Sequence, residues 1–417
     1  MREAFENSLR DARDDFATWC AFADWLAEQG DPLGAFMQTQ LALEDESRSK
    51  DERDALKARE AELLAAHRAE WLGPLEPFLF PPPGPAEDDP DGEWDVPPPI
   101  EFTWRRGFLD SIRTPVVNTG LGQALADSPA AVLLRELRIE SHSQHSDWQD
   151  FRTTPRVPTP PGVSYHEGYF ELIGSRCLES VRVFRTGDED DEPPEDGWCD
   201  CHSHLDGLEH LLLAMPRAEE FHLLSNSVRL RTVFASDRLT RLRVFRAYHI
   251  GEERGADAYY EYPLDVLAAN LAFANLTHLL FHPHQSEEGY EDTAQSYLPL
   301  DQVRALVNSP HLTKLTHLQL RLSDMGDAGV GAIVASGILK RLKWLDLRHG
   351  CITDDGARLF AAHPDARNLD RLDLSYNGVT AAGLKALRDA GVNAVANHPL
   401  TQDQLDSREY LTHGDFE

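Results

Sequence analysis

The chain has 417 residues, and its 71 acidic and 40 basic side chains give a formal net charge of −31 at pH 7. Such a charge disfavours binding to nucleic acid or to anionic lipid. No apolar run reaches the roughly 18 residues that a membrane-spanning helix needs, and five cysteines are too few for a disulfide framework. We therefore expect a cytoplasmic protein with neither a membrane nor a nucleic-acid partner.

The first part of the chain is predicted to be helical. Apolar residues follow helical spacing over 16–26, 36–43 and 56–71, and Gly30-Asp31-Pro32 breaks the pattern. The run FADWLAEQGDPLG, which ends at Gly34, and the run AHRAEWLGPL, which ends at Leu75, resemble the bacterial repeat-companion domain. That resemblance implies a small all-α domain over 1–73 beside a repeat array, and it implies no particular chemistry.

A proline-rich segment follows at 74–99, with ten prolines and several acidic residues. Such a composition is typical of an extended linker between domains. It would also suit a peptide that docks into an aromatic groove. We expect a linker, because no P-x-x-P motif with flanking basic residues is present.

Three copies of the pattern L-x-x-L-x-L, beginning at Leu315, Leu342 and Leu369, lie 27 residues apart. Three further sets of residues recur in the same register: Met325, Ile352 and Val379; Gly329, Gly356 and Gly383; Ile333, Phe360 and Leu387. The last two leucines of each copy have the period of a strand, and the residues after each Gly have helical spacing. One strand and one helix cannot bury both apolar faces, so the repeats must stack into a solenoid.

The third copy continues to Asn377 and Val379. It resembles the L-x-x-L-x-L-x-x-N-x-L signature of leucine-rich repeats, and the period resembles the ribonuclease-inhibitor-like type. The resemblance implies an α/β solenoid, a horseshoe with parallel strands on the concave face and helices on the convex face. We expect it to span 100–400, with an apolar cap at the N-terminal end and an acidic tail at 401–417.

The strand pattern can be followed upstream, with copies expected to begin at Leu134, Leu178, Ala218, Leu239 and Leu276. The longer intervals place insertions after the strands, at 141–168, 185–207, 251–262 and 282–298. We expect these insertions to emerge along one rim of the solenoid, where they would mark a binding face.

The inner strand face supplies the first set of candidate partner-binding residues. Its outward positions are mixed in charge, and they include Arg138, Arg182, Arg243, Arg321, Trp344, Asp346, Arg348, Arg371 and Asp373. Arg pairs with carboxylates and stacks on aromatic rings, which suits a protein interface. The alternative is a set of cross-strand ion pairs that only keep the sheet soluble.

The insertions supply a second set, in which acidic residues alternate with aromatic ones: Trp148, Asp190, Asp191, Trp198, Tyr259, Tyr260 and Tyr290. Aromatic side chains would anchor a partner, and the acidic charge would steer a basic one. The alternative is solvated loops that carry incidental aromatic residues.

One cluster has the side chains that zinc prefers: Cys199, Cys201, His202 and His204. Its C-x-C-H-x-H spacing lacks the usual gap between paired cysteines, so we expect an acidic loop rather than a metal site. The sequence contains no G-x-S-x-G, Walker A, H-E-x-x-H or G-x-G-x-x-G motif.

These observations predict a non-enzymatic adaptor or inhibitor that grips one partner protein, as a monomer or in a one-to-one complex. We expect no cofactor, and a partner with a basic surface, such as a transcription factor. Two alternatives stay open: a metal-dependent effector centred on the cysteine–histidine cluster, and a structural subunit of a larger assembly.

Overall fold

A computed structural model describes residues 1–81, 100–140, 167–187, 207–225, 228–251, 262–285 and 298–407. The chain divides into two units, Met1–Arg185 and Thr186–Glu417. Within the described residues, no helix combines the length and the apolar character needed to cross a bilayer.

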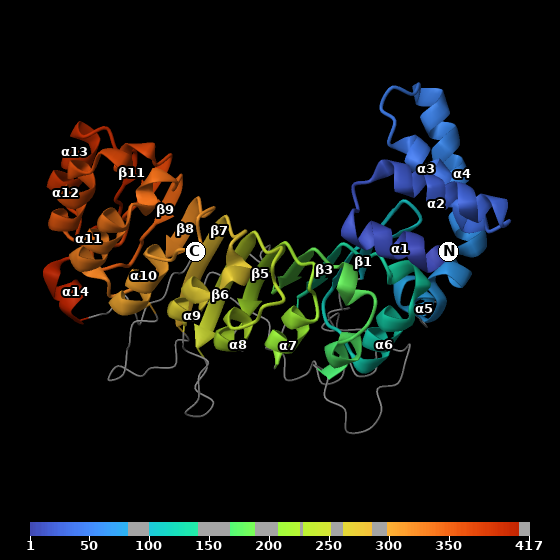
Figure 1. Ribbon diagram of the computed structural model, residues 1–417, viewed down its shortest axis with the longest axis horizontal. Helices are drawn as coiled ribbons and strands as arrows, with labels where there is room; N and C mark the ends of the chain where they lie inside the picture. The colour runs from blue at the N-terminus through green and yellow to red at the C-terminus, as the bar shows by residue number, and fades with distance from the viewer. Residues whose placement is uncertain are drawn as a thin grey trace, which may run out of the picture. The chain divides into compact units, whose positions relative to one another are not determined.

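Helices open unit 1 (Figure 1), and local capping sets where they begin. The Asp15 side chain accepts from two backbone N–H groups of the second helix, Asp31 precedes a helix with proline in its first turn, and Ser49 forms a capping box with Glu52. The helix over Arg2–Asp11 was not predicted. The elements are α1 (Arg2–Asp11), α2 (Phe16–Glu28), α3 (Pro32–Leu43), α4 (Lys50–Leu72) and α5 (Glu76–Leu79).

A β-hairpin begins the sheet of unit 1, where the sequence predicts an apolar cap. Strands β1 (Glu101–Arg105) and β2 (Phe108–Thr114) are antiparallel, and both residues of the turn between them have positive φ, 51° at Arg106 and 84° at Gly107. Gly107 packs so closely on α3 that a Cβ there would lie 2.3 Å from Met37 Cγ. Strand β2 then pairs in parallel with β3 (Glu136–Ile139), and α6 (Thr119–Asp127) and β4 (Val183–Thr186) complete the unit.

The N-terminal helices and the hairpin of unit 1 share one hydrophobic core. Trp19, Phe22, Phe36 and Trp71 from the helices cluster with Phe108 from β2. The predicted boundaries at 73 and 99 stay predictions. The structure adds that the helical region continues through α5 to Leu79, inside the range predicted as linker.

Unit 2 alternates strands and helices along the chain (Figure 1). Its strands are β5 (Glu220–Ser225), β6 (Val244–Gly251), β7 (His278–Gln285), β8 (His317–Leu320), β9 (Trp344–Asp346), β10 (Arg371–Asp373) and β11 (Ala394–Val395). Each strand pairs in parallel with the next, in chain order.

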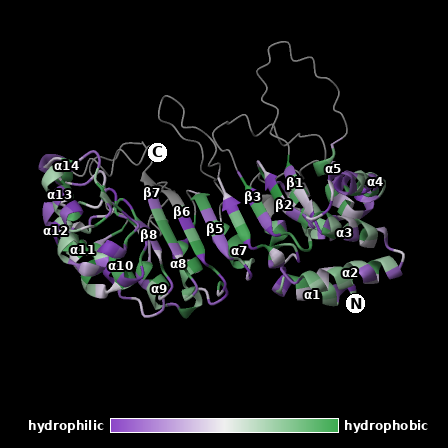
Figure 2. Ribbon diagram, turned by 90° about the horizontal axis from the view of Figure 1, so that it is seen from above, coloured by the Kyte–Doolittle hydropathy of each residue, from purple (hydrophilic) through white to green (hydrophobic). Residues whose placement is uncertain are grey.

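The helices of unit 2 connect these strands. They are α7 (Leu208–Leu213), α8 (Leu230–Phe234), α9 (Leu264–Ala269), α10 (Leu300–Val307), α11 (Gly326–Ser336), α12 (Asp354–Ala362), α13 (Ala381–Asp389) and α14 (Gln402–Ser407). The last of these lies in the range predicted as an acidic tail, and its Leu405 is buried. Along β8 the apolar residues Leu318 and Leu320 alternate with the polar residues His317 and Gln319. Figure 2 shows hydrophobic and hydrophilic colours mixed along the strands.

The 27-residue period is a packing period. All leucines of the three L-x-x-L-x-L copies are buried. Among them, Leu318, Leu345 and Leu372 are paired on adjacent strands. Parallel strands with helical connections and a stacked apolar core confirm the predicted α/β solenoid, and the N-terminal helical region is present as well.

Two of the predicted strand registers are wrong by three residues. The structure aligns Val181, Phe184 and Thr186 with the pattern, not Leu178, Val181 and Val183, because β4 spans Val183–Thr186. Likewise β6 begins at Val244, so its inward residues are Phe245 and Ala247. The cause is an ambiguity of spacing, since three buried residues follow one another at intervals of three in both segments: Leu178, Val181 and Phe184, and Leu239, Leu242 and Phe245.

The predicted insertions lie mostly outside the described residues. That they share one rim of the solenoid therefore stays a prediction. The described residues show only where they begin. Strands β3 and β4 of unit 1, and β6 and β7 of unit 2, are each followed within two residues by such a segment. The insertions therefore leave the sheets at the C-terminal ends of parallel strands.

Candidate functional site

The strand face of unit 2 consists of the side chains on β5–β10 that alternate with the buried leucines. One row of this face is aromatic. The ladder aligns His278 with His317, and His317 with Trp344. The two imidazole rings stack with centroids 4.0 Å apart, and the Trp344 ring lies 6.4 Å from that of His317. All three side chains are half-buried, and we call them the aromatic row.

The aromatic row is uncharged near neutral pH. Burial lowers the pKa of both imidazoles, and the His317 ring lowers the pKa of His278 further. Each ring is also oriented by the residue before it, because Thr277 Oγ1 lies 2.8 Å from His278 Nδ1 and Thr316 Oγ1 lies 2.9 Å from His317 Nδ1. The row therefore presents fixed, neutral rings, which suits stacking against an aromatic or apolar side chain.

Arg371 extends the row onto β10, where it aligns with Trp344. Its Nη2 donates to Asp373 Oδ2 at 2.8 Å. Asp373 is buried, whereas more than half of the Arg371 side chain is exposed. The carboxylate thus holds the guanidinium in place without covering it.

Beside the aromatic row lies a polar cluster of four residues, Gln319, Arg321, Asp346 and Arg348. Oδ2 of Asp346 accepts from Gln319 Nε2 at 3.0 Å, from Arg321 Nε at 2.9 Å and from Arg348 Nη2 at 3.0 Å. Its Oδ1 accepts from the backbone N–H of Arg348 at 3.0 Å. Asp346 is therefore the centre around which two guanidinium groups are ordered.

Burial dominates the electrostatics of this cluster. Burial raises the pKa of the Asp346 carboxyl to about 7, although the neighbouring Arg321 guanidinium lowers it. Arg321 also lies 3.4 Å from the buried His282 ring, measured from Nη1 to Nε2. An acid, two guanidiniums and a histidine at this spacing do not form a nucleophile–base pair, and their contacts are those of a largely buried polar network.

A second stack follows the strands. The rings of His349, Tyr376 and His398 stack with centroids 4.7 Å and 4.9 Å apart. Each residue has a left-handed backbone with φ between 53° and 56°, an uncommon conformation for residues other than glycine. Their equivalent positions in successive repeats explain why one unusual conformation recurs.

The remaining predicted residues of the strand face lie elsewhere. In unit 1, Arg138 lies on β3, and its Nε is 3.3 Å from Glu140. Arg182 and Arg243 each precede a strand and do not lie on it, as a consequence of the register error. Arg182 Nη2 donates to the backbone carbonyl of Arg10 at 2.9 Å, and Arg243 Nη2 donates to Glu219 at 2.6 Å.

Eleven predicted residues lie outside the described residues: Trp148, Asp190, Asp191, Trp198, Tyr259, Tyr260, Tyr290, Cys199, Cys201, His202 and His204. The proposed rim contacts and the metal cluster are thus not placed. Over the ranges that the structure describes, no group of three or more His, Cys, Asp or Glu side chains is arranged to hold a metal ion.

Sequence reasoning missed His278, His317 and Gln319. A signal for the two histidines is present, because the string Leu-Thr-His-Leu occurs at 276–279 and again at 315–318. Two identical strings at the same repeat position predict two histidines side by side on adjacent strands. Gln319 carries no comparable signal.

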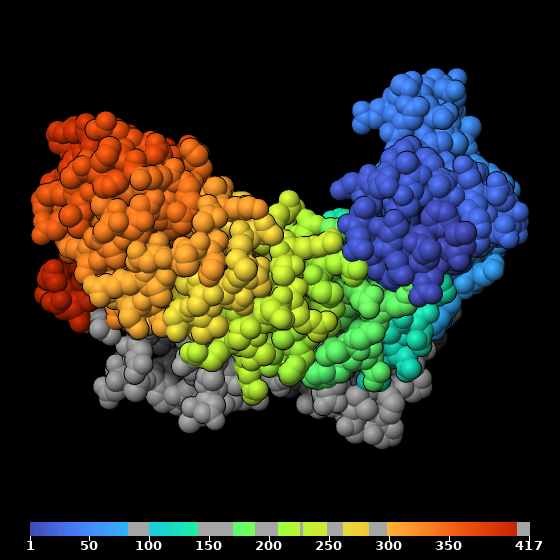
Figure 3. Space-filling view, in the orientation of Figure 1, coloured from blue at the N-terminus to red at the C-terminus, as the bar shows by residue number. Residues whose placement is uncertain are grey.

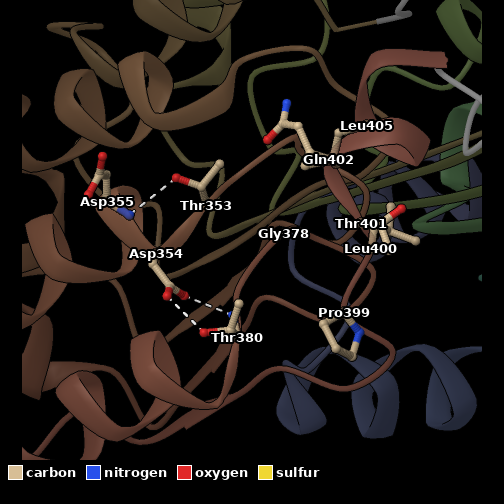
Figure 4. A pocket seen from close by; sticks show the side chains of 10 residues that line it. All are labelled: Thr353, Asp354, Asp355, Gly378, Thr380, Pro399, Leu400, Thr401, Gln402 and Leu405. Atoms are coloured by element: carbon tan, nitrogen blue, oxygen red, sulfur yellow. Dashed lines mark hydrogen bonds between the residues drawn. The ribbon is translucent and has the colours of Figure 1, made fainter.

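A pocket lies near the start of α12, lined by Thr353, Asp354, Asp355, Gly378, Thr380, Pro399, Leu400, Thr401, Gln402 and Leu405 (Figure 4). Its polar groups are engaged in helix caps. Asp354 accepts from the N–H and the hydroxyl of Thr380, both at 2.8 Å, and the N–H of Asp355 donates to Thr353 Oγ1 at 3.2 Å. These contacts join successive repeats, so the pocket is a structural feature of the array.

Three comparisons relate the chain to known proteins. A family profile described as Leucine Rich repeat matches residues 311–334, 342–361 and 366–387. A structure from Bacteroides fragilis, determined as a structural-genomics target, is 18% identical with a TM-score of 0.45, and the match covers 69% of this chain and 73% of that one. A leucine-rich-repeat protein of Leptospira interrogans is 12% identical with a TM-score of 0.22, over 67% of this chain and 93% of that one.

No curated protein matches the chain. The profile covers the three regular copies that the sequence analysis singles out, and it does not reach the N-terminal helices, whose likeness to the repeat-companion domain stays a prediction. Residues within 311–387 are therefore leucine-rich repeats, a type of array that generally serves as a scaffold for protein interactions.

Proposed function

We propose that the chain is a non-enzymatic scaffold, an adaptor or inhibitor, that binds one partner protein in the cytoplasm through its strand face. The aromatic row carries this proposal. Trp and Arg are the side chains most enriched among residues that dominate binding energy, and here Trp344 and Arg371 are neighbours on adjacent strands. Figure 3 shows one face of unit 2, on which the colours from yellow to red follow the repeats in chain order.

The charge of the chain supports a finer proposal about the partner. A net charge of −31 would steer a protein with a basic surface toward the scaffold. A nucleic-acid-binding regulator such as a transcription factor has such a surface, and an acidic scaffold that covers it would act as an inhibitor. The complex would contain one copy of each protein.

A pull-down with the full chain tests the proposal. The wild type, Trp344→Ala and Arg371→Glu would be used to capture proteins from a lysate of the native host, at low salt and at 0.5 M salt. We expect one major partner, lost from the Trp344→Ala sample and reduced by salt. Arg358→Glu, on α12, is the matched control, because Arg358 and Arg371 are exposed to nearly the same extent, 57% and 54%. Equal capture by wild type and Trp344→Ala would contradict a strand-face interface, and capture that ignores salt would contradict the electrostatic part.

A further inference from the structure

The ion pairs of the strand face share one orientation: the guanidinium points outward and the carboxylate lies beneath it. Arg371 is 54% exposed and Asp373 is 4% exposed. Arg348 and Asp346 have the same order at 11% and 0%. In unit 1, Arg113 is more exposed than its partner Glu140 and less exposed than its other partner, Glu101.

Ion pairs on the helices have no fixed order. On α12, Asp355 is more exposed than its partner Arg358, whereas Asp354 is less exposed than the same arginine. On the strand face, Arg371 presents a largely exposed guanidinium above a buried carboxylate. In a chain with an excess of acidic residues, this face presents hydrogen-bond donors.

The carboxylate partners of these arginines limit which anions the strand face can bind. Arg371 on β10, and Arg321 and Arg348 just after β8 and β9, already have carboxylate partners, so these residues form no long track of uncompensated cations of the kind that a nucleic acid requires. One carboxylate at a time can still be bound, because a guanidinium has five N–H donors and Asp373 accepts only part of them from Arg371.

The aromatic row and Arg371 set the distance between two contacts along a bound peptide. Adjacent strands lie about 4.8 Å apart, and an extended chain advances about 3.3 Å per residue. A peptide that crosses the strands from His317 to Arg371 passes over two strand intervals, since Trp344 lies between them in the ladder. That path corresponds to about three residues of extended peptide.

We propose that strands β7–β10 bind an extended acidic segment of the partner, in which an Asp or Glu stands two or three residues from an aromatic residue. The aromatic ring stacks on His317 and Trp344, and the carboxylate is bound by Arg371. The proposal rests on the proposed scaffold function and names the chemistry of its contact. The negative charge elsewhere in the chain does not prevent such binding at physiological salt, where the screening length is about 8 Å.

Selection from a library of random dodecapeptides displayed on phage tests the proposal. The full-length wild type, Trp344→Ala, Arg371→Glu and the control Arg358→Glu are each used as bait at 0.15 M salt. Peptides selected by the wild type and by Arg358→Glu, but lost with both strand-face variants, should carry the acidic and aromatic pair. If the lost peptides are basic, or if none is lost, the proposal is wrong.

A double-mutant cycle then tests the pairing itself. A synthetic peptide from the lost class should bind the wild type about tenfold more tightly than its Glu→Gln version, as expected for a charge-assisted contact. With Arg371→Gln, which removes the charge and keeps an N–H donor beside Asp373, the two peptides should bind equally. Persistence of the tenfold difference would exclude Arg371 as the carboxylate's partner.

Two further results separate this inference from the proposed function. A single-stranded oligothymidine of twenty nucleotides should not compete with the peptide. Competition by it would contradict the proposal that the ligand of the strand face is a protein segment. If a native partner is captured equally by the wild type, Arg371→Glu and Trp344→Ala, the scaffold function holds. The partner then does not bind at the strand face, and the proposed acidic and aromatic contact is wrong. If no partner is captured although the peptide binds and responds to Arg371, the scaffold function fails and the site remains.

Discussion

The imidazole rings of His278 and His317 stack with their centroids 4.0 Å apart and their planes inclined by 15°. Two protonated rings at this distance would repel each other, and burial already disfavours the charged form of each. Their lowered pKa values follow from that environment. The pair is therefore a neutral platform whose character depends on pH.

The first prediction concerns this pair. In His317→Gln the pKa of His278 should rise toward its ordinary value of about 6.5, because protonation of His278 is no longer opposed by the charge that His317 acquires as the pH falls. The measurement is an NMR titration of the histidine ring signals. His210→Gln, an exposed substitution on α7, is the control and should leave the pKa of His278 unchanged. The same pKa in His317→Gln as in the wild type would contradict coupling between the rings.

The sign of the pH dependence follows from the lowered pKa values. A histidine whose pKa is lower in the folded state contributes its full stability above the unfolded pKa. That contribution is lost as pH falls below about 6.5 toward the folded pKa. Peptide binding to the aromatic row should weaken in the same range if it depends on neutral rings, as a titration of affinity against pH would show.

The second prediction concerns two glycines in different repeats, Gly331 on α11 and Gly383 on α13. A Cβ at Gly383 would lie 2.3 Å from Asp354 Oδ1, which accepts from Thr380, whereas a Cβ at Gly331 meets only Leu359 Cδ1 at 4.0 Å. Gly383→Ala should therefore destabilise the array by about 1–3 kcal/mol. Gly331→Ala should stabilise α11 by about 0.5–1 kcal/mol, because alanine loses less conformational freedom on folding than glycine.

Urea denaturation of both glycine variants measures these effects. Adding Asp354→Ala to Gly383→Ala removes the obstructing carboxylate, so the cost of the alanine should fall in that background. An equal cost in both backgrounds would mean that the carboxylate is not the obstacle.

The glycines also show what the sequence can predict. The recurrence of Gly356 and Gly383 was visible as a period, but its reason was not, since it depends on a carboxylate of the preceding repeat. Asp327 Oδ1 accepts from the N–H of Gly356 at 2.9 Å, and a Cβ on Gly356 would lie 2.4 Å from that oxygen. Period predicts the fold, whereas the contact between repeats needs coordinates.

Strand register marks a second limit. Where apolar residues follow at intervals of two, as in Leu318 and Leu320, the register was predicted correctly. Where buried residues recur at intervals of three, as in Leu239, Leu242 and Phe245, two registers fit the pattern equally well. The error moved Arg243 onto the strand face and left Arg246 off it. Burial of the turn before a strand cannot be distinguished from burial of the strand by hydrophobicity alone.

The candidate site was predicted only in part. Trp344 and Arg371 were identified because the regular repeats fix their positions. Asp346 and Asp373 were assigned to the same face, and the structure adds that both are buried and hold arginines in place. A side chain that points away from the leucine core is not necessarily exposed, because long neighbours on adjacent strands can cover it.

The third prediction concerns Asn377, the single family asparagine among the three regular repeats. Its Oδ1 accepts from the N–H groups of Gly350 and Ile352, both at 2.9 Å, and its Nδ2 donates to the carbonyls of Leu347, Leu374 and Ser375. The residue is fully buried. Asn377→Ala leaves buried polar groups without these bonds and should cost about 3 kcal/mol.

Urea denaturation measures the cost of Asn377→Ala. Asn393→Ala is the control, since Asn393 is exposed and its side-chain amide donates to the carbonyl of Asp370. It should cost less than about 1 kcal/mol. Similar costs for the two variants would contradict the role of Asn377 in joining repeats.

The fourth prediction concerns Arg13 and Asp110, which couple the N-terminal helices of unit 1 to strand β2. Arg13 Nη2 donates to Asp110 Oδ1 at 2.8 Å, and about a tenth or less of each side chain is exposed. Burial lowers the pKa of Arg13, and Asp110 opposes that shift. Asp110→Ala leaves a buried guanidinium with less compensation and should cost about 3 kcal/mol.

Replacing both partners separates the value of the pair from the cost of breaking it. The double variant Arg13→Met, Asp110→Leu should be less destabilised than Asp110→Ala, because the buried Arg13 guanidinium is removed together with its carboxylate. Arg135, which also donates to Asp110, has Glu136 as a second partner in both variants. Lys385→Ala on α13 is the exposed control, as its partner Asp389 is solvent-accessible, and it should cost less than about 1 kcal/mol. Hydrogen exchange of the β2 amides reports on the coupling directly: exchange should accelerate in Asp110→Ala, and unchanged protection there would show that the helices and the strand are held together by their shared apolar core alone.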